Sequence, residues 1–386
     1  MRLDRLSPSA NSTLNSKRPK IFAILHHSIP YLIARQVLRW GWSLPVIFLI
    51  SVSMSLVGSA QEPFIAGQGD VVPRDVREMV DRGLQYLMES QEETGAWRKA
   101  SDPGSGTTGL ALLAFLASGE DPNFGKYSVP IRKALRSIIN SQDGDTGYIG
   151  SSMYHHGFAM LALAEAYGAV DEKDLWNDSN AAVNRKRSIG EALELCVRSA
   201  VTSQNANPLG AWRYSPSGRD ADTSVSGAVL VGLLAARNAG IEVPDKSIDR
   251  AVQYYTSMTG SNGIVGYSGG LSGFGESIAR SSIACLIYSI AKRKDLKQFA
   301  SVQNYVTANL TEQSNYPEYA RYYQAQALFQ VDLAAWDKWN KMIVRQLKSS
   351  QRDDGSFEGQ LGPTNSTSMA ILALALNYRF LPIYER

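Results

Sequence analysis

One short segment of the sequence indicates how this chain folds. It begins with Asp220-Ala221-Asp222-Thr223-Ser224 and continues with the run Gly227-Ala228-Val229-Leu230-Val231-Gly232-Leu233-Leu234-Ala235. The second run contains no charged residue and has no polar face to give to water, so it predicts a helix buried on every side. Asp222, Thr223 and Ser224 are residue types whose side-chain oxygens cap the free amides of a first helical turn. A polar cap followed by an apolar helix is the unit from which a central ring of helices can be built.

This unit recurs along the chain, each time after an amphipathic helix and a connecting turn. The apolar helices are expected at residues 109–117, 157–164, 227–235, 283–291, 322–328 and 369–376. Six such pairs predict an all-α fold, an (α/α)6 toroid with the apolar helices inside and the amphipathic helices outside. An open superhelix of helical pairs is the alternative, but it would expose a polar side on both helices of each pair.

The first sixty of the 386 residues differ from the rest. Seven basic residues precede the apolar run 44–57, and Gly58-Ser59-Ala60 follows it as a small-residue cleavage site. This order predicts an export signal cut after Ala60, and therefore a periplasmic or extracellular protein. The alternative is an uncleaved anchor that contacts the membrane through residues 44–57, although the run is shorter than the roughly 20 residues of a spanning helix. Residues 61–74 are then a flexible tether, residues 75–380 the toroid and residues 381–386 a tail.

The charge balance argues against a nucleic-acid partner. The whole chain carries a net charge of +3, but 7 of its 39 basic residues and one of its 36 acidic residues lie in the leader, which leaves 32 basic against 35 acidic residues. No basic patch interleaved with aromatic residues follows the leader, so no nucleic-acid site is expected.

The cysteines and histidines give no sign of a metal site or a cofactor. Cys196 and Cys285 lie inside apolar helical patterns, which predicts buried free thiols. His26 and His27 belong to the leader, so only His155 and His156 remain as imidazole ligands. Such a set is too small for a zinc site built on His and Cys, and we expect no metal and no cofactor.

A spaced Gln…Gly-x-aromatic element marks the turns between the helices of a pair. It occurs as Gln91/Gly95/Trp97, Gln204/Gly210/Trp212 and Gln351/Gly355/Phe357. A glycine that ends a helix, with an aromatic ring packed behind it, is a sound structural device. The element resembles the repeat of the prenyltransferase and squalene oxidase repeat family, which includes squalene and terpenoid cyclases and protein prenyltransferase β subunits. The resemblance covers most of residues 76–378 and implies an α/α toroid, in which the element ties an outer helix to its neighbour.

In such a toroid the inner helices begin at one end, so their cap residues and amide dipoles meet there. This end, which we call the mouth, is where a ligand is expected. The candidate ligand-binding residues by the repeat alignment are Tyr154, His155, His156, Trp212, Tyr214, Thr223, Glu276, Arg280, Tyr322 and Tyr323.

Asp220 and Asp222 are the candidate catalytic residues, because the stretch around them is similar to the acidic motif with which squalene cyclases protonate an alkene. That chemistry needs a protonated carboxylic acid in a dry pocket, which clustered carboxylates help to maintain, and aromatic faces to stabilise a carbocation. The motif is incomplete in either alignment. If Asp220 and Asp222 match its first two acids, Thr223 stands where the third acid would be, and if Asp222-Thr223 matches its last acid and threonine, both upstream acids are missing. Asp222 is equally suited to cap the inner helix, with Asp220 as a solvated loop acid.

Two main hypotheses about function follow. The first is a non-catalytic scaffold that binds an apolar, isoprenoid-like ligand or a protein partner at the mouth. The second is a terpenoid-cyclase-like enzyme with Asp222 as general acid and Asp220 as its partner. A glycan-active enzyme that uses two facing carboxylates, one of them Glu276 or Glu318, is a minor alternative.

Overall fold

The computed structural model describes residues 72–177, 186–270, 275, 277–311 and 313–378. The described residues form twelve α-helices, one short 3-10 turn (Glu172–Asp174) and no named β-strand. The predicted export signal and the C-terminal tail lie outside them. None of the described helices is both long enough and apolar enough to cross a membrane.

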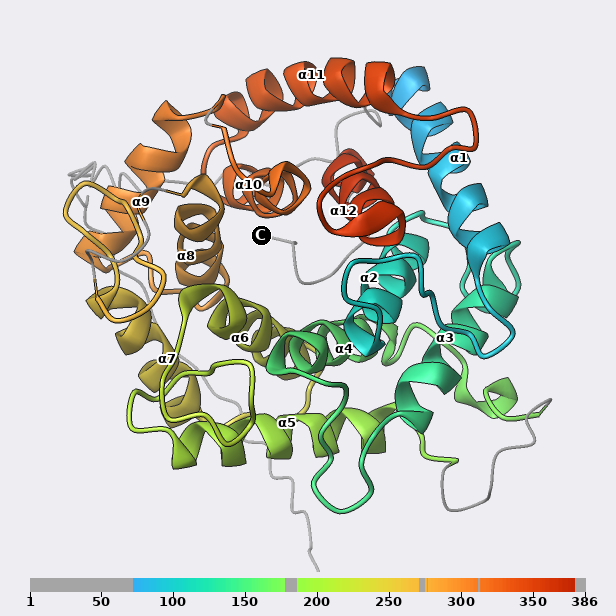
Figure 1. The fold of residues 1–386 in the computed structure, drawn as a ribbon, viewed down its shortest axis with the longest axis horizontal. Coiled ribbons are helices and arrows are strands. Elements are labelled where there is room, and N and C mark those ends of the chain that lie inside the picture. Colours follow the sequence, from blue (N-terminus) through green and yellow to red (C-terminus); the bar gives the residue numbers. More distant parts are fainter. Residues whose placement is uncertain (1–71, 178–185, 271–274, 276, 312, 379–386) are drawn as a thin grey trace, which may run out of the picture. The chain divides into compact units, whose positions relative to one another are not determined.

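The helices alternate between an outer and an inner ring, as the sequence predicted (Figure 1). The outer helices are α1 (Arg74–Ser90), α3 (Ser128–Asn140), α5 (Ile189–Ala206), α7 (Asp245–Ser257), α9 (Lys297–Ala308) and α11 (Leu333–Ser350). The inner helices are α2 (Ser105–Leu116), α4 (Met153–Ala166), α6 (Thr223–Asn238), α8 (Ile278–Ile290), α10 (Pro317–Val331) and α12 (Gly362–Ala375). The (α/α)6 toroid is thereby confirmed, and the open superhelix is excluded because α12 packs against α2 and α1.

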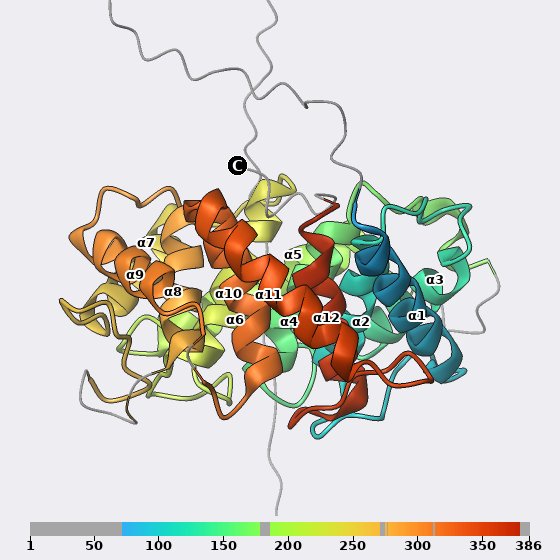
Figure 2. The same cartoon turned by 90° about the horizontal axis from the view of Figure 1, so that it is seen from above.

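The two kinds of helix differ in how they are buried. Every residue of α2 from Ser105 to Phe115 is buried, whereas α1 buries one face that includes Val76, Val80, Leu84 and Leu87. This follows from their sequences, because α2 has no charged residue and α1 has apolar residues at helical spacing. Figure 2 shows the toroid from its side, with α1 beside α11 and α12 where the ring closes.

The glutamines of the turn elements connect adjacent outer helices. The side-chain amide of Gln204 donates to the carbonyl of Gly210 in its own turn and to that of Ser247 in α7, both at 2.8 Å. Gln91 and Gln142 make the same pair of bonds to their own turns and to α3 and α5. Gln351 donates to Met79 in α1 at 2.9 Å and so joins the last outer helix to the first. Each glutamine thus links one repeat to the next, the role that the family resemblance implied.

The glycines of four turns, Gly95, Gly147, Gly263 and Gly355, allow the close approach of the next outer helix. Gly147 has a φ of 75°, and a Cβ built on it would lie 2.4 Å from the carbonyl oxygen of Leu195 in α5. Only glycine tolerates both the left-handed backbone and this contact. The turn that leads into α4 therefore packs directly on the backbone of α5.

Candidate functional site at the mouth

Asp222 caps α6 and is fully buried. Its Oδ1 accepts a hydrogen bond from the backbone amide of Val225 at 2.7 Å, the capping role expected from its position before the helix. Its Oδ2 is buried and has no hydrogen-bond partner among the described residues. Burial raises the pKa of Asp222 to about 6, although the amide of Val225 and the charge of Arg213 act in the opposite direction.

Arg213 is the central cation of the site and was not among the residues predicted from the sequence. Its Nε lies 3.6 Å from Oδ2 of Asp222 and 3.7 Å from Oδ2 of Asp220. Its guanidinium carbon lies 5.3 Å from the ring centroids of both Tyr214 and Tyr267, so the cation faces two aromatic rings. The hydroxyls of the two tyrosines are 3.0 Å apart. The only signal in the sequence was its place beside Trp212 and Tyr214, which does not distinguish it from other loop arginines.

Asp220 and Asp222 have different surroundings although both lie close to Arg213. The side chain of Asp220 is 67% exposed, whereas that of Asp222 is 0% exposed. Water therefore screens Asp220 from its neighbour, so the two carboxyls do not form a dry acid pair. Asp222 is the buried acid of the site, and Asp220 is a surface acid.

Tyr254 of α7 is a second buried group of the site, and it too was not predicted from the sequence. Its hydroxyl is buried and has no hydrogen-bond partner among the described residues. Burial is the main cause of its raised pKa, and the negative charge of Asp222 is the next cause, so the two groups are close enough to interact. No local pattern indicated that Tyr254 would meet Asp222, because the two residues belong to different repeats.

Aromatic side chains extend from the mouth into the inner ring. The hydroxyls of Tyr154 in α4 and Tyr319 in α10 are 2.6 Å apart, although α4 and α10 are not neighbours in the ring. The ring of Tyr323 packs edge-on against Tyr319 and Tyr322, with centroid distances of 4.9 and 4.7 Å. Phe158 stacks on Tyr154. The predicted ligand-binding residues Tyr154, Tyr322 and Tyr323 thus pack against other aromatic side chains, and Tyr322 and Tyr323 are buried.

Both histidines are buried, and both of their ring nitrogens have partners. Nδ1 of His155 accepts from the amide of Gly106 at 2.9 Å, and its Nε2 lies 3.1 Å from Oδ2 of Asp102. Nδ1 of His156 accepts from the amide of Ile149 at 3.1 Å, and its Nε2 donates to the carbonyl of Cys196 at 3.0 Å. Burial lowers the pKa of His156 to about 4, so its ring is neutral at physiological pH.

The contact of His156 is a repeat feature. Ser226 accepts from the amide of Trp212 at 3.0 Å, and Thr367 accepts from that of Phe357 at 2.9 Å. In each case a side chain in the first two turns of an inner helix accepts from the third residue of the preceding glycine turn. His156 does the same for Ile149, so its contacts stabilise the fold and leave neither ring nitrogen for a ligand.

Three other candidate residues also make internal contacts. Trp212 is buried and its indole N–H donates to the carbonyl of Ala200 at 2.9 Å. Thr223 is buried and donates to the carbonyl of Gly266 at 2.8 Å. The guanidinium of Arg280 donates to the carbonyl of Val265 at 2.9 Å. Glu276, the remaining candidate, lies outside the described residues.

Glu318, the acid considered for a glycan-active enzyme, is buried at the start of α10. Its Oε1 accepts from the amide of Leu361 at 2.8 Å, and its Oε2 has no hydrogen-bond partner among the described residues. No cluster of three or more His, Cys, Asp or Glu side chains suited to a metal ion occurs in the described part of the chain.

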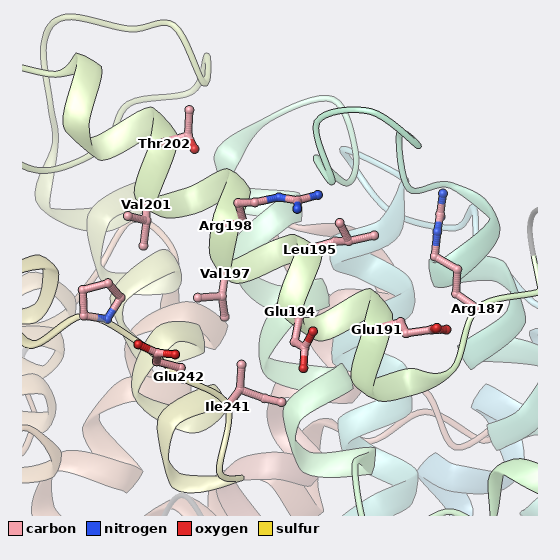
Figure 3. Close-up of a pocket in the computed structure, with 11 residues that line it drawn as sticks. Arg187, Glu191, Glu194, Leu195, Val197, Arg198, Val201, Thr202, Ile241 and Glu242 are labelled. Atoms are coloured by element: carbon pink, nitrogen blue, oxygen red, sulfur yellow. The ribbon is translucent and has the colours of Figure 1, made fainter. Parts of the chain in front are cut away.

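A groove of about 720 Å³ lies away from the mouth, on the outer wall of the toroid. It runs along α5 and the segment 241–244 that leads into α7 (Figure 3). Figure 3 shows Val197 and Ile241 on its apolar side, with Glu194 and Glu242 beside them. None of the candidate ligand-binding residues lines this groove.

Comparisons with known proteins support the fold. No family model matches the chain, and no curated protein sequence matches it. An inactive variant of an α-1,6-mannanase from Salegentibacter has a similar structure, with a TM-score of 0.56 and 11% identity, over 78% of this chain and 99% of the mannanase. A type II terpene cyclase from Scytonema gives a TM-score of 0.53 and 13% identity, over 80% and 98% of the two chains. A heparin-specific unsaturated glucuronyl hydrolase gives a TM-score of 0.54 and 9% identity, over 79% of this chain and 96% of the hydrolase. At these identities the likeness concerns the fold alone.

Proposed function

We propose that this protein is a non-catalytic binding scaffold whose ligand docks on the surface of the mouth, around Arg213, Tyr214 and Asp220. The observation that carries the proposal is the cation of Arg213, which faces the rings of Tyr214 and Tyr267 and lies within 4 Å of two carboxylates, the exposed Asp220 and the buried Asp222. Arginine and tyrosine are the residue types that most often anchor a partner at protein interfaces. Tyr214 is 46% exposed, so its ring is available for such a contact.

The filled interior supports binding at the surface. The hydroxyl contact between Tyr154 and Tyr319 joins α4 to α10, and the rings of Phe158, Tyr322 and Tyr323 pack behind it. A ligand that entered the ring would have to displace these side chains, which is costly in a close-packed interior. Of the two ligand classes expected from the sequence, a protein partner therefore fits the mouth better than a buried isoprenoid.

Proton-transfer catalysis of the terpene-cyclase type is the second candidate, and the surroundings of Asp222 favour it. A carboxyl with a pKa of about 6 is partly protonated near neutral pH and could donate a proton. Tyr154 and Phe158 lie at the same mouth, and aromatic faces can stabilise a carbocation. Two observations weigh against it: Asp220 is exposed, and Oδ1 of Asp222 is already used by the helix cap.

The test compares the purified protein with two variants, Asp222→Asn and Tyr214→Ala. Asparagine caps a helix as well as aspartate does but cannot supply the proton, and Tyr214→Ala removes exposed surface without opening the core. Each protein is incubated with an extract of the cell envelope, purified again and analysed by mass spectrometry for retained and altered molecules.

If the protein is a binding scaffold, the parent protein and Asp222→Asn should retain a molecule without altering it. Tyr214→Ala should retain much less of the same molecule. A molecule that changes mass or retention time only when Asp222 is intact would establish catalysis and refute the scaffold. Retention that is equal in all three proteins would place the ligand away from the mouth and would also refute the proposal.

A further inference from the structure

We infer that the mouth binds an extended, uncharged peptide segment of a protein partner, whose main chain hydrogen-bonds to Arg213 and Asp220. This inference rests on the proposed function and names its ligand class. It starts from hydrogen-bonding groups that the described protein leaves unused.

Arg213 is the first of these groups. Its guanidinium carries five N–H donors, yet among the described residues it makes no hydrogen bond, because the nearest carboxylate oxygens lie 3.6 and 3.7 Å from Nε. Its side chain is 26% exposed, and none of its nitrogens is among the buried atoms that lack a partner in the described residues, so a ligand at the mouth can reach these donors. An acceptor supplied by a ligand would complete the site.

The charges around Arg213 limit what that acceptor can be. Asp220 and Asp222 both lie within 4 Å of the guanidinium, so they already balance its positive charge. A phosphate or carboxylate ligand would bring a further negative charge next to two acids, which is unfavourable. A neutral carbonyl oxygen can accept from Arg213 without this penalty.

Asp220 supplies the complementary acceptor. Its carboxylate is 67% exposed and accepts no hydrogen bond from the described residues, so it is free to accept from a ligand N–H. A peptide chain is uncharged along its main chain and carries a carbonyl acceptor and an N–H donor in every residue. One such chain lying across the mouth can therefore accept from Arg213 and donate to Asp220.

The surface that would hold the peptide is rigid and partly apolar. The side-chain amide of Asn207 donates to the carbonyls of Gly218 and Asp220 at 3.0 and 2.9 Å, and Ser203 donates to that of Pro216 at 2.7 Å. These bonds fix the loop that carries Arg213 and Tyr214, so little conformational entropy is lost when a ligand binds.

Two exposed side chains on this loop offer apolar contact to a peptide. Tyr214 presents its ring beside Arg213, and Leu209 is exposed closer to the end of α5. A tyrosine ring gives a large contact area at low entropic cost. The main-chain bonds and these contacts together favour an extended segment with small or aliphatic side chains.

The test begins with a phage-displayed library of linear peptides, selected on the purified protein. Enriched peptides are synthesised with a fluorescent label, and their Kd is measured by fluorescence anisotropy. Arg213→Lys keeps the charge but removes the planar donor fork, and the expected loss of charge-assisted hydrogen bonds weakens binding by at least about tenfold. Arg219→Lys, a change of the same type at an exposed position of the same loop, is the matched control and leaves Kd unchanged.

A change in the ligand tests the main-chain contact directly. N-methylation of successive peptide amides removes one N–H donor at a time, and we expect one position to lose affinity for the parent protein but not for Asp220→Ala. Thermal unfolding of each variant shows that it is folded.

Three outcomes would overturn the inference: no enriched peptide, peptides that bind Arg213→Lys as tightly as the parent, or peptides in which no single N-methylation matters. If no peptide binds but the parent protein still retains an envelope molecule that Tyr214→Ala does not retain, the peptide inference is refuted and the proposed function is supported. If neither binds, both fall.

Discussion

Asp222→Asn should change the pH dependence of stability, because Asp222 is a buried acid with a raised pKa. The pKa is about 6 in the folded protein, against 3.8 for the ordinary carboxyl, and burial is the first cause. Between these two values the folded state holds the proton more tightly than the unfolded state. The contribution to stability is therefore fully present below pH 3.8 and is lost as the pH rises through 6.

The magnitude follows from the size of the shift. About two pH units correspond to about 3 kcal/mol of differential stability. The asparagine of the variant cannot ionise but keeps the cap on the amide of Val225. The free energy of unfolding of the parent minus that of Asp222→Asn should therefore fall by about 3 kcal/mol between about pH 4 and pH 8. Other titrating groups cancel in this difference.

Urea unfolding of both proteins, followed by circular dichroism at half-unit steps from about pH 4 to pH 8, measures this difference. A difference that stays constant within about 1 kcal/mol over the range would refute the reasoning. It would mean that Arg213 and the helix cap hold the carboxyl ionised throughout, and the terpene-cyclase candidate would lose its proton donor. A fall of the expected size is compatible with either function, because a raised pKa is needed for catalysis but does not establish it.

Three further predictions concern the residues that hold the helices and turns of the toroid together. Gln204→Leu should cost about 2–4 kcal/mol in urea unfolding, because two buried carbonyls lose their donor, whereas the same change at exposed Gln253 should cost under about 0.5 kcal/mol. Gly147→Ala should destabilise more than Gly240→Ala, since both have positive φ but only the first would bring a Cβ to 2.4 Å from a carbonyl oxygen; equal losses would show that backbone strain alone matters. His156→Ser should make the free energy of unfolding less sensitive to acid. The pKa of His156 is lowered from 6.5 to about 4, so its contribution to stability is fully present above pH 6.5. About 3 kcal/mol of that contribution is lost as the pH falls through 4. If the free energy of unfolding of the variant fell with decreasing pH as steeply as that of the parent, the lowered pKa of His156 would be contradicted.

The fold could be predicted from the sequence because the physical signals for it are local and repeated. An apolar run with no polar face must be buried, and a polar cap marks where it starts. Six copies of this pattern, joined by glycine turns, leave few architectures that bury every apolar helix. Asp222 was identified as a helix cap for the same reason, because its role depends on its immediate neighbours.

The arrangement of the mouth was not predictable in this way, because it depends on residues far apart in the chain. Tyr154 and Tyr319 are separated by 165 positions, and their hydroxyls meet only because the ring brings α4 and α10 into place. Tyr254 approaches Asp222 from a different repeat. Whether a tyrosine lines a pocket or packs on another tyrosine is decided by packing across the ring, which no local pattern encodes.

The sequence by itself thus determined the helices, their pairing and the end of the toroid where polar caps gather. Only the tertiary structure decided that Asp222 is buried while Asp220 is exposed, and that Arg213 lies between two tyrosine rings with its donors unused by the described residues. The physical reason is that helix formation follows from residue types within a few turns, whereas burial and the pairing of polar groups depend on what the rest of the chain places beside them.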